Sequence, residues 1–349
     1  MNRSSSLTDY FITVYPLKCQ PETRYLATKD GMKSVATSIA IVSLPILFFT
    51  SFCILRKTPE SMKSVQLGLL NLNFCYTISQ FTQAFLIVPI FYLPFAAFNT
   101  VGLVNYLNIP PVFQMYFSIT MINATLVSIT ILFENRSSSI SFNKFRISKR
   151  KYKILWIFLN CLGTVLLVTP PFFNLPDQNA SKLEILKIFP CPLKEFFMEP
   201  TVVIAFGNHW ESYLIQSSKA LFFISMLQIL YFSACCIYYL VIYKRSNISA
   251  TTRRLQLRVF IGVVIQSLIP IILTNIPVIT FLNKNTREQY DQISNNLLFI
   301  SSIVQNGVAS LSILMVHRPY RKFLVSIFCK EKVKVIQISV CSKTEQFRI

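Results

Sequence analysis

The long apolar stretches of this 349-residue chain contain no aspartate or glutamate. By our boundaries all 14 acidic residues lie in loops or tails, which argues against transporters and intramembrane enzymes that need an acid inside the bilayer. Glycine is scarce, with 7 residues and no Gly-rich phosphate-binding loop. The two histidines, His209 and His317, are far apart along the chain, so they predict neither a metal cluster nor a catalytic dyad. The sequence therefore predicts no enzyme and no cofactor.

Long apolar stretches dominate what remains, with 53% hydrophobic residues and a mean hydropathy of +0.51. Seven of them have at least the ~20 residues that cross a ~30 Å hydrocarbon layer as a helix. Helices are required there because lipid offers no partners for backbone N–H and C=O groups. The chain is therefore predicted to be an all-α membrane protein, a bundle of seven transmembrane helices. The expected spans are Ser34–Leu55, Val65–Phe91, Val112–Phe133, Ile154–Leu175, Tyr213–Tyr243, Val259–Leu282 and Ile293–Val316.

The basic residues predict the orientation of this bundle. The loops after spans one, three and five, together with the tail, hold 23 Lys and Arg, against 9 on the opposite side. The positive-inside rule then places the N-terminal segment 1–33 outside, the receptor-like domain 34–316 in the membrane and the tail 317–349 in the cytosol. The net charge of +20 is explained by attraction to anionic membrane lipids. Nucleic-acid binding is the weaker interpretation, because the cations are divided among short loops.

Two of the nine cysteines, Cys19 and Cys191, fall in outer segments. Outer compartments are oxidising, so the two thiols can pair, the alternative being two unrelated free cysteines. Asn179 begins a glycosylation sequon in an outer loop. The stretch after Pro319 could form a short amphipathic helix on the inner leaflet, with Cys329 as a candidate for palmitoylation or as an unmodified cytosolic thiol.

A ligand pocket is expected among the outer halves of the spans, where a few polar groups stand among many apolar ones. Gln216, Lys219 and Phe223 share one face of the fifth span at helical spacing. Lys219 is either a counter-charge for an acidic or carbonyl ligand or a side chain that extends to the outer interface. The full set of candidates is Gln83, Gln114, Tyr116, Gln216, Lys219, Phe223, Asn295 and Asn296.

Short strings at the ends of the spans carry a family resemblance. They occur in order over about residues 19–325, and their order is more specific than any one of them. The strings are Lys57-Thr58-Pro59, Met62-Lys63, Phe133-Glu134-Asn135-Arg136, Pro176-Asp177-Gln178, Phe189-Pro190-Cys191-Pro192, Thr251-Thr252-Arg253, Leu255-Gln256, Gln305-Asn306-Gly307 and His317-Arg318-Pro319-Tyr320-Arg321.

With these strings the chain resembles the class H serpentine receptors (Srh) of nematodes. The resemblance implies a fold like that of G-protein-coupled receptors, detection of a small environmental molecule, and signalling through a heterotrimeric G protein. The apolar residues around the candidate pocket predict that this molecule is largely apolar. It also implies a multi-pass protein of the plasma membrane in the cilia of chemosensory neurons. The chain departs from rhodopsin-like receptors, since it lacks a cysteine at the outer end of the third span, Cys-Trp-x-Pro in the sixth and Asn-Pro-x-x-Tyr in the seventh.

The string Glu134-Asn135-Arg136 lies at the inner end of the third span, where rhodopsin-like receptors carry an acid before an arginine. By spacing alone Glu134 and Arg136 do not share a helix face. Either they belong to a G-protein surface with Arg253 and Arg254, or they only anchor the helix at the membrane boundary.

Two alternatives to a G-protein-coupled chemoreceptor stay open. The first is a ligand-gated odorant channel of the insect type, which has the inverse topology and is opposed by the charge bias. The second is a membrane scaffold that does not signal.

Overall fold

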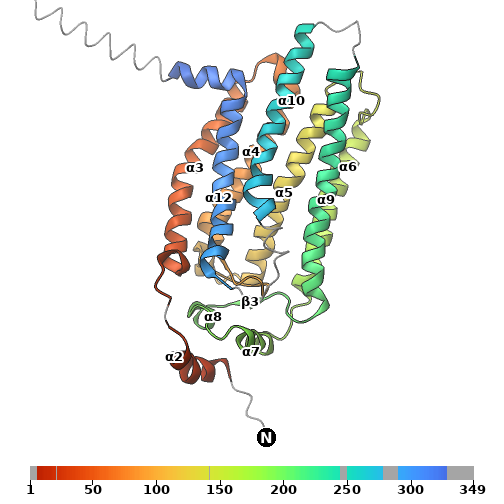
Figure 1. Cartoon of the computed structure of the whole chain (residues 1–349). Coiled ribbons are helices and arrows are strands. Elements are labelled where there is room, and N and C mark those ends of the chain that lie inside the picture. Colours follow the sequence, from red (N-terminus) through yellow and green to blue (C-terminus); the bar gives the residue numbers. More distant parts are fainter. Residues whose placement is uncertain (1–5, 21, 141, 244–249, 278–289, 328–349) are drawn as a thin grey trace, which may run out of the picture.

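The computed structural model describes residues 6–20, 22–140, 142–243, 250–277 and 290–327. Within these ranges long helices run lengthwise through the molecule (Figure 1). The N-terminal segment and a small sheet lie at one end, which we call the outer end, and the helix that follows α12 lies at the opposite, inner end.

Seven long helices form the bundle in the described part of the chain. Six of them are long and apolar enough to cross a membrane. The exception is the second, whose apolar run is interrupted by Asn71, Asn73 and Gln80. The seven are α3 (Lys29–Lys57), α4 (Lys63–Phe81) with its π-helical continuation η4 (Thr82–Ile87), α5 (Pro111–Ser138), α6 (Arg150–Phe173), α9 (His209–Ile237) with η6 (Tyr238–Ile242), α10 (Ala250–Pro270) with η7 (Ile271–Asn275), and α12 (Gln292–Val316).

Two predicted spans are corrected by the structure. The second ends at Ile87, not Phe91, because Val88 adopts a left-handed φ of 42° and the following Pro89 lacks an N–H to continue the helix. The sixth begins at Ala250, not Val259, since polar residues add two turns before the apolar run. Its predicted end at Leu282 lies outside the described residues.

A small antiparallel sheet closes the outer end, which the all-α prediction did not include. Strand β2 (Ala97–Thr100) pairs with β1 (Pro89–Phe91) on one side and with β3 (Val202–Val203) on the other. The sheet therefore joins the first outer loop to the second. Strands of two to four residues are too short for a period-of-two pattern to reveal them.

Short helices complete the outer end and the inner loop between α3 and α4. Tyr92 and Phe95 of the first outer loop and Phe196 of the second are almost fully buried, and Tyr92 and Phe196 pack edge to face. The short elements are α1 (Leu7–Asp9), η1 (Tyr10–Val14), α2 (Tyr15–Lys18), η2 (Tyr25–Ala27), η3 (Glu60–Met62), η5 (Leu103–Leu107), α7 (Gln178–Ile188) and α8 (Glu195–Met198).

A further helix follows α12 and covers residues 318–327. Tyr320 is fully buried against the bundle and Phe323 packs beside it, whereas Val325 is exposed. This is the amphipathic helix expected after the seventh span. Cys329, the palmitoylation candidate, lies outside the described residues.

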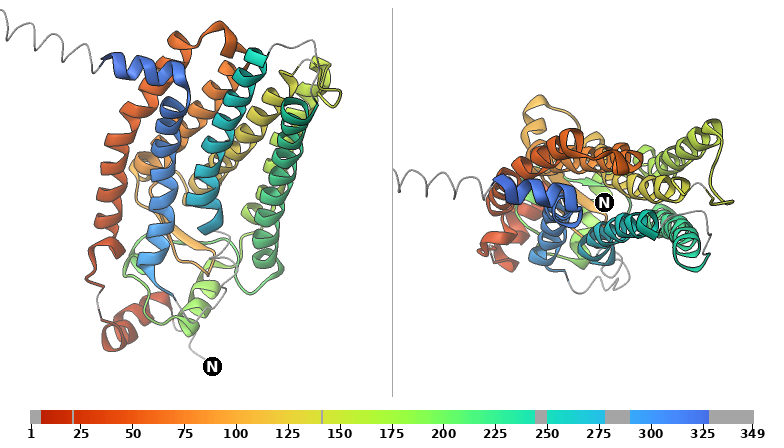
Figure 2. Two further views of the ribbon diagram at one scale, coloured as in Figure 1. Left: turned by 45° about the horizontal axis from the view of Figure 1, so that its top comes forward. Right: turned by 90° about the horizontal axis from the view of Figure 1, so that it is seen from above.

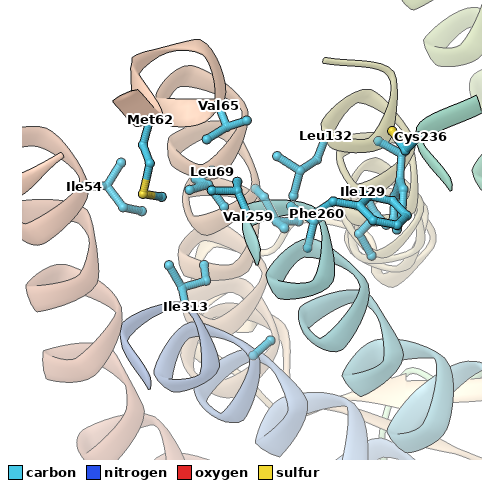
Figure 3. Close-up of a cluster of buried hydrophobic side chains, with 14 of the residues drawn as sticks. Ile54, Met62, Val65, Leu69, Ile129, Leu132, Cys236, Val259, Phe260 and Ile313 are labelled. Carbon is cyan, nitrogen blue, oxygen red and sulfur yellow. The ribbon is translucent and has the colours of Figure 1, made fainter. Parts of the chain in front are cut away.

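The main apolar core lies toward the inner end, where Ile54, Leu69, Leu132, Phe260 and Ile313 come together from five helices (Figure 3). Helix α12 lies between α3 and α10 (Figure 2). Its approach to α3 is close, because a Cβ added to Gly307 would stand 2.8 Å from the Cβ of Ser43. A larger side chain at Gly307 would force these two helices apart.

Candidate functional site

Glu134 is fully buried at the inner end of α5 and is neutralised from the neighbouring helix. Its carboxylate lies 2.5 Å from the ammonium of Lys153 on α6 and also accepts a hydrogen bond from the hydroxyl of Ser138. Lys153 donates a second bond, of 2.6 Å, to the side-chain oxygen of Asn135. A buried carboxylate needs such a partner because desolvation of an isolated charge is costly. The sequence did not single out Lys153, which was one of many loop cations.

Arg136 points away from Glu134 and across the bundle. Its guanidinium donates a hydrogen bond to the backbone carbonyl oxygen of Gln256 on α10. The residue is 3% exposed, and its Nε has no hydrogen-bond partner among the described residues. Arg253 and Arg254, the α10 residues predicted to share a G-protein surface with Arg136, are more accessible. Arg253 is half-buried and Arg254 is exposed. The inner end is therefore closed by α10, with a cation buried under it.

Next to this contact, α10 packs tightly on the end of α12. The side chain of Gln266 is hydrogen-bonded to the ring of His317 at 2.8 Å, and a Cβ on Gly262 would meet Val316 at 2.9 Å. Burial, together with the charge of Arg136, lowers the pKa of His317 from 6.5 to about 4, so the ring is neutral at pH 7. Tyr320 continues the connection to the end of α3, with its hydroxyl 2.7 Å from that of Thr58.

A chain of buried polar side chains connects the outer and inner halves through α3, α4 and α12. Ser310 donates to Thr50 or to Asn73, at 2.8 Å in each case, and Asn306 donates to Gln80 one turn further out. The hydroxyl of Tyr76 nearby is buried and has no hydrogen-bond partner within the described part of the chain. Such networks have few alternative arrangements, so the three helices are expected to move as a unit. The resemblance string Gln305-Asn306-Gly307 falls in this network.

In the outer half a cavity of about 150 Å³ lies between the β1–β2 hairpin, α5 and α9. Met115 and Ile119 come from α5, and Leu214, Ile215, Ser218 and one acidic residue, Glu211, come from α9. The lining is mainly apolar, and its aromatic members, Phe91 and Phe98, come from the hairpin. A site of this kind suits a small apolar molecule.

The eight residues predicted to form a ligand pocket do not line this cavity. Gln216 and Phe223 are exposed on the outward face of α9, and Lys219 is partly exposed beside them. The face of α9 that lines the cavity is therefore shifted by one residue, from the expected Gln216 and Lys219 to Ile215 and Ser218. The sequence did contain a signal for the observed lining, because Leu214, Ile215 and Ser218 also recur at helical spacing.

The buried members of the predicted set hold the outer loops in place. Asn296 donates to the carbonyl oxygen of Leu26 at 2.7 Å, and Asn295 donates to that of Leu93 at 3.2 Å. Gln114 donates to the carbonyl oxygen of Ile109 at 2.7 Å. Of the other two, half-buried Tyr116 bonds to Thr169 on α6, and Gln83 bonds to Ser79 one turn earlier in its own helix and to Ser302 on α12.

Cys191 of the second outer loop forms a disulfide with Cys19 of the N-terminal segment, with the two Cα atoms 5.3 Å apart. This bond attaches the N-terminal segment to the loop. Asn179 is exposed in the first turn of α7, where a glycan would extend into solvent.

Comparison with known proteins identifies the bundle. Residues 27–330 match the serpentine-type seven-transmembrane GPCR chemoreceptors called Srh. The chain belongs to the Srh family of chemoreceptors. It is 47% identical over 345 residues to serpentine receptor class H-72 of Caenorhabditis elegans, covering 99% of this chain and 98% of that protein. The match begins just before α3 and continues past the helix at 318–327, so it includes all the bundle helices. As an Srh protein the chain is a multi-pass membrane protein with seven spans, the less apolar α4 being one of them.

Proposed function

We propose that this Srh protein senses a small, largely apolar environmental molecule and signals through a heterotrimeric G protein. The observation that carries the proposal is the hydrogen bond from the buried guanidinium of Arg136 on α5 to the backbone carbonyl of Gln256 on α10. A buried cation with an unbonded Nε is poorly solvated, so outward movement of α10 would rehydrate it. The contact therefore favours a closed arrangement that a modest force can open.

Opening of α10 would create the G-protein surface. Arg136 would become accessible beside Arg253 and Arg254, which already lie at or near the surface of α10. A cationic rim of this kind suits the carboxylate end of a partner's C-terminal helix. Glu134 does not compete for Arg136, because Lys153 holds it on the far side of α5.

The ligand would enter the apolar cavity between the hairpin, α5 and α9. An apolar molecule there contacts Met115 on α5 and Leu214 on α9. A change in how these two helices pack would shift Arg136, because Arg136 lies on α5 itself. We place the protein in the plasma membrane of chemosensory cilia, as its family membership suggests.

Coupling is tested by replacing Arg136 in cells that express the full chain with a G protein and a second-messenger reporter. The probes are a panel of short-chain alcohols, ketones, esters and aromatic aldehydes. Arg136→Ala should abolish a response that the natural chain gives at equal surface density. Arg150→Ala is the matched control, an exposed arginine at the start of α6. Normal signalling by both Arg136→Ala and Arg253→Ala would contradict the proposed surface.

Orientation is tested separately with an epitope tag placed before Thr8. A G-protein-coupled receptor requires the tag to stain on intact cells. Staining only after permeabilisation would instead support the odorant channel of inverse topology.

A further inference from the structure

Another cavity, of about 380 Å³, opens at the inner end between α10, the loop after α3 and the start of the helix at 318–327. It is separate from the outer cavity and from the buried guanidinium of Arg136. Its charged lining residues are Arg258 on α10, with Arg318 and Lys322 after α12. Helix α10 and the helix at 318–327 therefore both contribute cations to the lining of one basic cavity.

The three cations lack partners within the described chain. Each side chain is exposed, none has a hydrogen bond or ion pair to another described residue, and no carboxylate lines the cavity. His317 also lines it but is hydrogen-bonded to Gln266 and is neutral at pH 7, because burial lowers its pKa to about 4. The cavity thus concentrates three positive charges that nothing in the described protein compensates.

The remaining lining is apolar and lies at the inner boundary of the spans. Leu255, Val259 and Val316 come from the ends of α10 and α12, where the apolar runs of these helices meet the inner loops. A ligand that fits must be strongly anionic at one end and tolerate apolar contacts at the other. An anionic phospholipid at the inner leaflet has this composition, and basic hollows between transmembrane helices are suited to such headgroups.

We propose that this cavity binds the headgroup of a phospholipid that carries a phosphate monoester, of the phosphoinositide type. A phosphate monoester has a charge of about −1.5 to −2 at pH 7, which matches a three-cation site better than the single net charge of phosphatidylserine. Bound there, the headgroup bridges α10 to the end of α12. Since Arg258 lies two residues beyond Gln256, the lipid holds α10 in the closed arrangement that covers Arg136.

The test uses the purified full-length protein in phosphatidylcholine nanodiscs. Phosphatidylserine or a phosphatidylinositol phosphate is added at equal total charge, and the lipid retained by the protein is measured by native mass spectrometry. We expect the phosphoinositide to be retained preferentially. Because a basic residue near an anionic surface contributes about 1 kcal/mol, Arg258→Ala, Arg318→Ala and Lys322→Ala should each weaken retention about fivefold. Arg258→Lys should keep most of it, and Arg150→Ala, outside the cavity, should have no effect.

Three results would overturn the proposal. Equal retention of the two lipids, or equal weakening by Arg150→Ala, would mean only general attraction to the inner leaflet. The detergent-solubilised protein could also be stabilised against heat by a soluble inositol phosphate as much as by the phosphoinositide lipid. That result would mean that the ligand is a free phosphate compound. None of these measurements depends on G-protein coupling, so the lipid site and the proposed function fail independently.

Discussion

The guanidinium of Arg136 on α5 is bonded to the backbone carbonyl of Gln256 on α10, a residue 120 positions later in the chain. Because the acceptor is a backbone atom, the hydrogen bond does not require the Gln256 side chain. It requires only that α10 keeps its position against α5. The contact therefore responds to helix movement more than to the sequence of α10.

The pair formed by Glu134 and Lys153 should be important for stability. Lys153→Met leaves Glu134 fully buried without its cation, which costs about 3 kcal/mol or more. We expect a clearly lower melting temperature in detergent, measured by a fluorescent thiol or tryptophan assay. The double variant Glu134→Gln with Lys153→Met should recover a substantial part of the loss. If Lys153→Met melts like the natural chain, the pair does not stabilise the fold.

The buried His317 should make stability sensitive to acid. Its pKa of about 4 in the folded protein lies below the ordinary value of 6.5, so the unfolded state binds the proton first as pH falls. Stability from this group is complete above about pH 6.5 and decreases by up to about 3 kcal/mol as the pH approaches 4. Melting curves at several pH values should show this slope, and His317→Asn should reduce it. An unchanged slope in His317→Asn would assign the acid sensitivity to other groups.

Gly262 should control how closely α10 packs on α12. A Cβ at this position meets Val316 at 2.9 Å and His317 at 3.1 Å, so Gly262→Ala should displace α10 and raise basal G-protein activity. The measurement is nucleotide exchange on the G protein in membranes without added ligand. Gly163→Ala on α6 is the matched control, because nothing lies within 4 Å of its Cβ position. Equal basal activity of the two variants would contradict the role of this contact.

Filling the outer cavity should remove ligand responses. Ile119→Trp places a large ring in about 150 Å³ of space between α5 and α9. We expect loss of the response to the odorant panel with normal surface staining. Gln216→Leu, on the exposed face of α9, should respond normally. A lost response in Gln216→Leu and a normal one in Ile119→Trp would favour the pocket predicted from the sequence.

The sequence predicts the bundle well because apolar length is a strong and local signal. It fails where a few residues decide the backbone, as at Val88 and Pro89, where the second span ends early in a strand. It also fails on helix rotation, since polar residues such as Gln216 occupy an outward face as readily as a pocket.

Pairs between helices were also beyond the sequence. The spacing showed that Glu134 and Arg136 face different ways, and the structure agrees. The spacing could not identify their partners, which are Lys153 and the backbone carbonyl of Gln256. Such contacts depend on the relative placement of α5, α6 and α10, which no local pattern encodes.

The central claim, that α10 opens to expose Arg136, is tested most directly by a distance across the inner end. Spin labels at Thr251→Cys on α10 and Lys151→Cys on α6 occupy exposed positions on the two helices. Exposed Cys161 and the tail cysteines Cys329 and Cys341 are replaced beforehand so that they take no label. Electron–electron double resonance in nanodiscs should show a single shorter distance for the receptor alone and a longer one, by several ångströms, with a nucleotide-free G protein bound. A distance distribution that stays unchanged when the G protein binds would contradict the account.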